Sequence, residues 1–316
     1  MNDIGFKSFH DAGQAVLNFL YQRFGFGLWM ITRVEGDDWI ILQTEDHAYD
    51  IHAGQVFNWA DSFCSQMVLS NGPKIAPLSD DIPAYHQAPI AQQLKIKAYI
   101  GQPLTKEDGS LFGTLCAIDP EPKSESLKEE QNLIELLGDL LSQILQTELR
   151  EIEQTRKNER LQAEALRDPL TGLYNRRAWD QFILAEEERC QLYGHPATVF
   201  MLDLNDLKFI NDMHGHAAGD ELIRQTAVVL TESCRNTDII ARLGGDEFAI
   251  LTVENDLESS QAHQKRILQN LQAKQISAAI GFAQRDPSDG ILTACLQADK
   301  NMYQDKLKRN YGLNGL

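Results

Sequence analysis

The sequence of 316 residues is poor in basic side chains. Lys and Arg total 29 and Asp and Glu total 46, so the formal net charge is −17. A chain this acidic repels the phosphates of nucleic acids and the anionic surface of membranes, so neither is expected as a partner. Small phosphorylated ligands are still allowed, because a local cluster of Lys and Arg can override the net charge.

Cysteine is scarce too, and long hydrophobic runs are missing. The five cysteines are scattered and form no Cys-x-x-Cys pair, whereas a disulfide framework or a zinc site would need a different pattern. The first residues lack the basic start and apolar stretch of a signal peptide. The longest apolar runs, such as 24–31 and 197–202, are far shorter than a membrane span. The cytoplasm is therefore the expected compartment.

Proline and aromatic residues are few, but the hydrophobic content is sufficient for a globular core. There are 10 prolines, 8% aromatic residues and 43% hydrophobic residues, which excludes a disordered or collagen-like chain. The length suggests two domains. Composition divides the chain into three zones: 1–123, 124–167 and 168–316.

The first zone mixes strands and helices. It has β-rich runs at 28–34, 38–43, 98–104 and 111–118. The first two flank the Gly36-Asp37 turn and the last two flank an Asp-Gly turn, which predicts two hairpins. The proline-punctuated stretch 71–89 is expected to be largely loop.

The second zone predicts one long helix. It has no proline and a single glycine, and apolar residues recur at helical spacing from Leu137 to Ile152. Two interpretations are open: a solvated linker helix, or a parallel coiled coil between two protomers. We prefer the coiled coil, because residues 133–152 are too apolar to leave exposed.

The third zone alternates helices with strands, so the expected fold class of the chain is α+β. Helices are predicted at 177–191, 218–233, 257–271 and 294–309, and strands at 197–202, 238–243, 248–253 and 276–284. From 197 to 284 the order is βαββαβ, which matches the ferredoxin-like motif.

Carboxylates gather where two of these strands end. Asp203 follows the buried strand, and Asp246 and Glu247 project from the Gly244-Gly245 turn. In the ferredoxin-like order the first strand lies beside this hairpin, so the three carboxylates should converge. A Gly-Gly-Asp turn alone is usually only a turn, but three converging carboxylates require cations. Oxygen ligands suit Mg²⁺ beside substrate phosphates, as two-metal phosphoryl chemistry requires.

The sequence Gly-Gly-Asp-Glu-Phe at 244–248 resembles the signature of the GGDEF diguanylate cyclases. Further matches lie at 168–176, 203–220 and 298–303, so the resemblance covers the whole third zone. It implies a cyclase-type palm that joins two GTP molecules into cyclic di-GMP and releases two pyrophosphates. It also implies two Mg²⁺ per half-site, with Mn²⁺ as an alternative.

The resemblance assigns roles to individual residues. Asp203, Asp246 and the carbonyl of Leu204 correspond to metal ligands, and Glu247 corresponds to the catalytic acidic residue that completes the metal site. Asn211 and Asp220 match the guanine readers, since a carboxylate accepts from N1–H and N2–H of guanine. The phosphate-binding residues implied by the resemblance are Lys208, Lys306 and Arg309.

Two departures from the family pattern stand out. Asn205 replaces a common aspartate, and alternation places it on the side of Asp203 but beyond the strand end. Lys306 and Arg309 are one residue closer together than in the usual motif.

The resemblance also implies regulation. Arg235 and Asp238 form the Arg-x-x-Asp pattern of the family's inhibitory product site, at its usual distance from Gly244. Cyclic di-GMP is thus the expected product and inhibitor. Joining two GTPs symmetrically needs two half-sites face to face, which predicts a C2 homodimer.

The hairpin at 98–119 resembles that of a GAF sensory domain. Such a domain either binds a small ligand or mediates dimerisation, and both alternatives stay open. Trp59, Cys64 and Tyr85 are expected in the core rather than as ligand contacts. The sequence thus predicts a GAF-regulated diguanylate cyclase. The alternatives are an inactive receptor for GTP or cyclic di-GMP, and a GAF dimerisation protein, which would leave the third zone unexplained.

Overall fold

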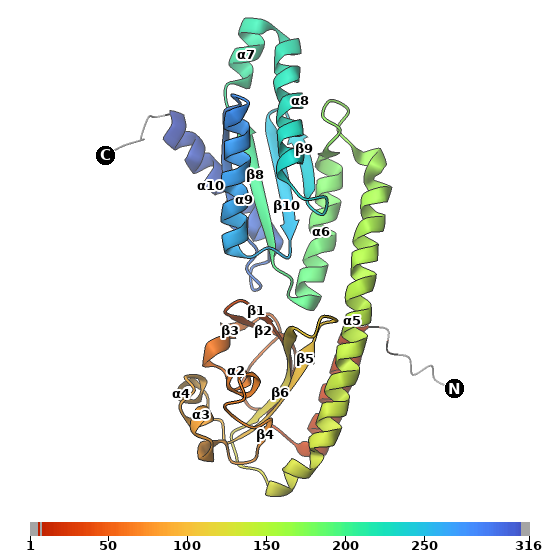
Figure 1. The fold of residues 1–316 in the computed structure, drawn as a ribbon, viewed down its shortest axis with the longest axis vertical. Coiled ribbons are helices and arrows are strands. Elements are labelled where there is room, and N and C mark those ends of the chain that lie inside the picture. The colour runs from red at the N-terminus through yellow and green to blue at the C-terminus, as the bar shows by residue number, and fades with distance from the viewer. Residues whose placement is uncertain (1–5, 7, 311–316) are drawn as a thin grey trace. The chain divides into compact units, whose positions relative to one another are not determined.

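The computed structural model describes residue 6 and residues 8–310, except for the side chains of the last two (Figure 1). The chain divides into two compact units. The first contains residues up to Arg156 together with Leu192–Gly194. The second contains Lys157–Gln191 and the residues from His195 onward.

The first unit is built on a six-stranded antiparallel sheet. Its strands are β1 (Leu28–Glu35), β2 (Asp38–Asp46), β3 (Val56–Asn58), β4 (Ile75–Ala76), β5 (Ala98–Thr105) and β6 (Leu111–Asp119). They lie in the order β3-β2-β1-β6-β5-β4. Both predicted hairpins are confirmed, as β1 pairs with β2 and β5 with β6.

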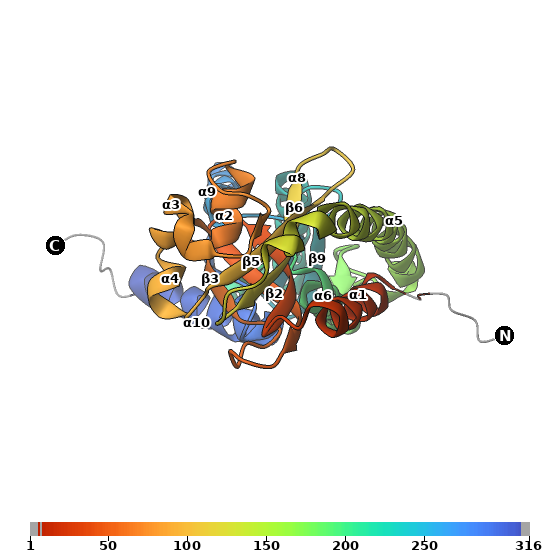
Figure 2. The same cartoon turned by 90° about the horizontal axis from the view of Figure 1, so that it is seen from below.

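Two layers of helices cover the sheet of the first unit. The helices are α1 (Phe9–Phe24), α2 (Phe63–Val68), α3 (Pro83–His86), α4 (Ile90–Gln93) and α5 (Gln131–Gln162). Side chains of β1 alternate between the two faces: Trp29 and Ile31 pack with α1 and α5, whereas Leu28 and Met30 pack with the short helices. Figure 2 shows α1 beside α5. The stretch expected as loop contains β4 and α3, both very short.

The long helix is confirmed, but the reason for expecting a coiled coil was wrong. A 3₁₀ turn at Glu125–Glu130 leads into α5, and another at Ala163–Leu166 follows it. Leu141 and Leu145 are 1% and 0% exposed, because the apolar stripe packs on the first unit's own core. No second protomer is needed to cover it. Leu136 and Leu140, on another face of α5, are the leucines left exposed in this part of the helix.

The second unit contains the predicted βαββαβ palm. Its strands are β7 (Tyr174–Asn175), β8 (Ala197–Leu204), β9 (Ile239–Gly244), β10 (Glu247–Val253) and β11 (Ala278–Gln284). Their order is β11-β8-β10-β9-β7, so β8 lies directly beside the β9–β10 hairpin, as expected. The extra strand β7 pairs in parallel with β9 and was not predicted, because two residues carry no periodicity.

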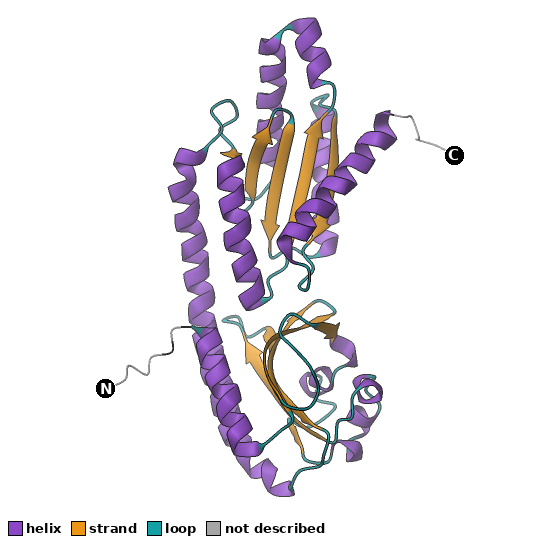
Figure 3. Ribbon diagram, turned by 180° about the vertical axis from the view of Figure 1, so that it is seen from behind, coloured by secondary structure: helices purple, strands orange, loops and turns teal. Residues whose placement is uncertain are grey.

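Helices cover both faces of this second sheet. They are α6 (Arg176–Tyr193), α7 (Leu207–His214), α8 (His216–Ser233), α9 (Leu257–Ala273) and α10 (Gly290–Asn310). Phe200 and Leu202 of β8 pack with α8 and α9, whereas Val199 packs with α6 and α10. The prediction that β8 is buried on both faces is confirmed. Figure 3 shows α10, which leads to the C-terminus, lying across its face of the sheet.

No helix among the described residues combines the length and apolar character needed to cross a bilayer.

Candidate active site

Strand pairing brings the predicted carboxylates to one edge of the second sheet. Glu247, the first residue of β10, lies directly opposite Asp203 of β8. The backbone N–H of Leu204 donates to the carbonyl oxygen of Asp246 at 3.0 Å. Asp203 is 8% exposed, while Glu247 is exposed. The register therefore fixes a cluster that is anchored in the sheet on one side and open to ligands on the other.

The turn that presents Asp246 depends on a glycine. Residues 245 and 246 connect β9 to β10, and Gly245 has φ 50°, a conformation that favours glycine. The guanidinium of Arg242 donates to the carbonyl of Gly245 at 2.8 Å and reaches Asp168 at 3.3 Å. Burial raises the pKa of Asp168, but hydrogen bonds from Thr171 and the charge of Arg242 outweigh it and lower that pKa. Arg242 thus links the turn at Gly245 to the carboxylate of Asp168.

A lysine from the far end of the sequence completes the cluster. Nζ of Lys306 on α10 lies 2.5 Å from Oδ1 of Asp203. Helix α10 reaches this position because it packs closely over Gly281 of β11. A Cβ atom at Gly281 would lie 2.1 Å from the backbone nitrogen of Met302. Because Gly281 has no side chain, α10 can pack this closely on the sheet.

Replacing Gly281 by alanine is expected to push α10 off the sheet. Overpacking of this kind costs about 1–3 kcal/mol, which lowers Tm by roughly 2–12 °C in a domain of this size. Differential scanning fluorimetry measures the shift. Leu296→Ala, on the outer side of the same helix where the side chain is 74% exposed, should leave Tm nearly unchanged. An unaltered Tm in Gly281→Ala would contradict the close packing.

The donor set at this edge fits Mg²⁺. Carboxylates of Asp203, Asp246 and Glu247 and the nearby backbone carbonyls are hard oxygen ligands, which this ion prefers. The ammonium group on Asp203 shows that the cluster attracts a cation. The residues present are therefore suited to the ion that the sequence led us to expect.

The candidate guanine readers lie together on the α7–α8 hairpin. Gly219 is buried against Asn211, and a Cβ atom there would lie 2.0 Å from Oδ1 of Asn211. Asp220 follows directly in α8, so the two side chains come from neighbouring positions of the hairpin. Lys208 is exposed in the first turn of α7, the helix that follows the carboxylate strand. Helix α7 itself was not predicted.

The structure describes the side chain of Asn205 but not that of Arg309, the two positions where the sequence departs from the family pattern. Asn205 lies one residue beyond β8, as expected, and its Nδ2 donates to Oγ of Ser277 at 2.9 Å. The side chain is thereby tied to the residue that precedes β11. Arg309 belongs to α10, but its side chain lies outside the described part of the chain.

Sequence reasoning missed an arginine beside the carboxylates. Nη2 of Arg176 lies 3.5 Å from Oε2 of Glu247, and its Nε donates to the carbonyl of Leu243 at 3.0 Å. Both charged side chains are more than half exposed, so the pair contributes little to stability. It places a positive charge beside Glu247. In the sequence, Arg176 belonged to the stretch 168–176 that matches the family, but nothing there assigned it a role.

The candidate product-site residues lie away from the carboxylates. Arg235 and Asp238 precede β9, whose other end leads into the Gly245 turn; six residues of strand span about 20 Å. Arg235 is exposed and donates to Oδ1 of Asn255 at 3.1 Å. Asp238 is 9% exposed and accepts from the backbone N–H of Arg235 at 2.7 Å. The two residues thus form one compact turn.

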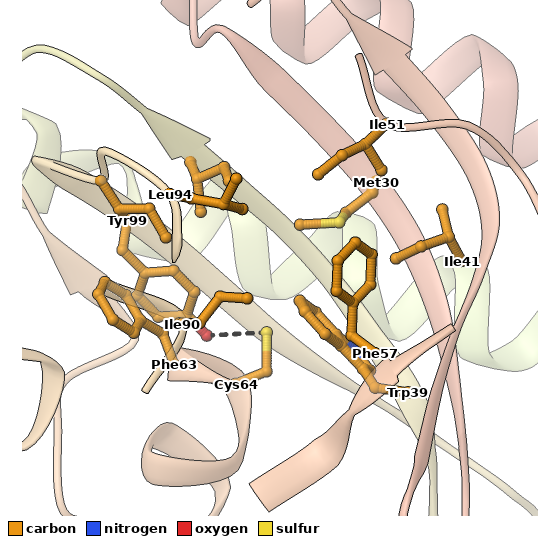
Figure 4. Close-up of a pocket in the computed structure, with 12 residues that line it drawn as sticks. Met30, Trp39, Ile41, Ile51, Phe57, Phe63, Cys64, Ile90, Leu94 and Tyr99 are labelled. Carbon is orange, nitrogen blue, oxygen red and sulfur yellow. Dashed lines mark hydrogen bonds between the residues drawn. The ribbon is translucent and has the colours of Figure 1, made fainter. Parts of the chain in front are cut away.

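The first unit contains an apolar cavity (Figure 4). Met30, Trp39, Phe63 and Cys64 are among the side chains that line it. Cys64 is buried and accepts from the hydroxyl of Tyr99 at 3.3 Å. Cys64 and Tyr85 are core residues, as expected, and Trp59 is half-buried.

Two family models match the chain. A family model described as "Diguanylate cyclase, GGDEF domain" matches residues 165–310, and a GAF domain model matches residues 8–145. The chain is 31% identical over 261 residues to the diguanylate cyclase DgcP of Escherichia coli (strain K12), covering 79% of this chain and 75% of that protein. The chain belongs to the GGDEF diguanylate cyclase family.

Other comparisons match shorter stretches of the chain. The diguanylate cyclase DgcP of Pseudomonas aeruginosa is 35% identical over 171 residues, which cover 52% of this chain and 24% of that protein. Among solved structures, the GGDEF domain of DgcB from Caulobacter crescentus in complex with c-di-GMP is 26% identical with a TM-score of 0.43. The match covers 45% of this chain and 90% of that one. The residues that the two family models match place the GAF domain in the first unit and the GGDEF domain in the second.

Proposed function

We propose that this protein condenses two GTP molecules into cyclic di-GMP and two pyrophosphates. The observation that carries the proposal is the register of β8 and β10, which sets Asp203 opposite Glu247 beside the Asp246 turn. Lys306 adds a cation at the same edge. A retired nucleotide site would have no physical reason to keep converging carboxylates that repel each other.

Two Mg²⁺ ions per half-site, or Mn²⁺ in their place, are expected to be held by Asp203, the Leu204 carbonyl, Asp246 and Glu247. When bound, these ions neutralise charge on the reacting phosphates and on the leaving pyrophosphate. Lys306 is close enough to Asp203 to move to a phosphate once other cations neutralise the carboxylates. Lys208 and Arg309 are proposed to bind the outer phosphates.

The reaction is a displacement at the α-phosphorus of each GTP. The 3′-hydroxyl oxygen of the other GTP forms the new P–O bond, and the bond to the β-phosphate oxygen breaks. Glu247 is proposed to take the hydroxyl proton, and Arg176 orients its carboxylate. Asn211 and Asp220 hold guanine, with Asp220 accepting from N1–H and N2–H.

One GGDEF domain supplies one half-site, so the active species is proposed to be a C2 homodimer. The GAF domain and α5 are the proposed controls on how two half-sites meet. A small regulatory ligand, if the domain takes one, would have to widen the apolar cavity, whose volume of about 10 Å³ has room for about one water molecule. Neither nucleic acid nor a membrane has a role in this scheme.

Incubating the purified chain with GTP and Mg²⁺ and separating the products tests the proposal. Cyclic di-GMP from the native chain, and none from Asp246→Asn, supports it. Glu188→Gln, which removes an exposed charge on α6, controls for the loss of one negative charge. Bound GTP or cyclic di-GMP without turnover, at every protein concentration, would instead identify an inactive receptor.

Replacing Arg235 by alanine is expected to raise sustained turnover. Arg235 is exposed beside Asp238 in the turn before β9, where a guanidinium can grip a phosphate and stack on guanine. Progress curves with added cyclic di-GMP measure the effect. Arg224→Ala, at an exposed position of α8, should stay as inhibited as the native chain. If cyclic di-GMP still inhibited Arg235→Ala fully, Arg235 would not be part of an inhibitory product site.

A further inference from the structure

Three ligating side chains of different chemistry meet in the GGDEF domain away from the carboxylate edge. Cys234 directly follows α8, Asp238 precedes β9, and His263 lies in the second turn of α9. One ligand atom from each lies within 4.8 Å of the others. Asp238 and His263 are 9% and 3% exposed, whereas Cys234 is half-buried, so an ion would enter past the thiol.

The histidine ring is held in place by its neighbours. Its Nε2 faces Sγ of Cys234 at 3.5 Å, and the ring also hydrogen-bonds the backbone of Ser233. Hydrogen bonds of this kind fix the orientation of a ligating histidine. Phe200 packs against the ring, with 5.1 Å between centroids. The imidazole therefore has little freedom to turn away.

Burial shifts the pKa of all three side chains. Burial lowers the pKa of His263 to about 4, with help from the positive charge of Arg266, so the ring is neutral. Burial, followed by the charge of Asp238, raises the pKa of Cys234 to about 12. Burial also raises the pKa of Asp238, against the opposing hydrogen bond from Arg235. The three side chains are thus withdrawn from solvent together, within 4.8 Å of one another.

We propose that Cys234, Asp238 and His263 bind one Zn²⁺ ion, with water as the fourth ligand. Thiolate, imidazole and carboxylate together suit zinc and not Mg²⁺. Ligand atoms around tetrahedral zinc stand roughly 3.3–3.8 Å apart, so closing the site needs shifts of about 1 Å. The S–H bond of Cys234 breaks, the sulfur binds zinc, and the proton leaves to solvent. The two anionic ligands then balance the charge of the ion.

Such an ion would tie the end of α8 and the start of β9 to α9. The pattern of cysteines along the sequence gave no sign of it, because only one cysteine takes part and the ligands are 4 and 25 residues apart. Asp238 also belongs to the proposed product site, so bound zinc should weaken product inhibition. That consequence rests on the proposed function, whereas zinc binding itself does not.

Titrating Co²⁺ alone into the chelator-treated full chain, without nucleotide, tests the site. Zinc sites of this kind accept cobalt, and a cysteine ligand gives a thiolate-to-cobalt absorption band. We expect one equivalent to saturate the band, Zn²⁺ to bleach it, and protons to be released in step. Cys234→Ser should abolish the band and His263→Gln should weaken binding at least tenfold. Cys295→Ser, another half-buried thiol of the same domain, should retain it.

The cobalt titration can overturn the proposed zinc site in two ways. No band in the native chain, or an undiminished band in Cys234→Ser, would overturn the proposal. Circular dichroism confirms that each variant is folded, and Asp238→Asn provides a second variant with a smaller change of shape. A rise in the native Tm with Zn²⁺ that is lost in His263→Gln gives independent support. None of these measurements uses GTP, so their failure would leave the proposed cyclase activity unaffected.

Discussion

Glu247→Gln is expected to lower the rate of cyclic di-GMP formation by about a hundred- to a thousandfold, a loss typical of removing an essential electrostatic group. The amide cannot accept the 3′-hydroxyl proton and is a much weaker cation ligand than the carboxylate it replaces. Glu247 is exposed, so the fold should not change. Initial rates of product formation, measured with circular dichroism and GTP binding on the same sample, check this result.

Two comparisons make this experiment decisive. Glu188→Gln removes an equal charge from an exposed position of α6 and should keep the native rate within twofold. Arg176→Ala removes the orienting partner of Glu247 and should lower kcat with little change in KM. A Glu247→Gln protein with more than a tenth of the native rate would show that the reaction does not depend on this carboxylate.

The second large effect is expected in base selection. Asp220→Asn replaces a carboxylate that accepts from guanine with an amide that partly donates. Each hydrogen bond to a charged group contributes about 1.5–3 kcal/mol, so kcat/KM for GTP should fall by about two orders of magnitude. Most of the change is expected in KM, because the base is held before and during the reaction. Inosine triphosphate lacks the N2 amino group of guanine. The ratio of kcat/KM for GTP to that for inosine triphosphate should therefore be smaller in Asp220→Asn than in the native chain.

The neighbouring residue provides the matched control. Glu221 is exposed on the same turn of α8 and bonds only side chains of its own helix, Arg224 and Gln225, in the contacts described. Glu221→Gln should leave KM for GTP within twofold of the native value. If Asp220→Asn behaved like this control, guanine would be read elsewhere.

The local parts of this fold followed from the sequence. Alternation and apolar runs located β1, β2, β8 and β10, and the βαββαβ order correctly placed β8 beside the hairpin. That order was enough to bring Asp203, Asp246 and Glu247 to one edge. These features could be predicted because the periodicity of apolar residues locates each strand, and the order of the elements along the chain then indicates the motif.

Features that depend on distant packing could not be predicted. The Lys306–Asp203 pair joins residues 103 positions apart and depends on the close approach of α10 over Gly281. The stripe of α5 looked like a dimer interface, because its apolar spacing does not say which surface covers it. The GAF core does so through residues such as Phe9 and Leu17 of α1. The role of Arg176 likewise depends on where the β10 hairpin lies.

The most direct test of the central claim is the ratio of pyrophosphate to nucleotide product formed from GTP. The account predicts two pyrophosphates for each cyclic di-GMP, no reaction when Mg²⁺ and Mn²⁺ are removed by chelation, and a rate per protomer that rises with protein concentration until dimers dominate. Release of inorganic phosphate with GDP, or no consumption of GTP at any protein concentration, would contradict it.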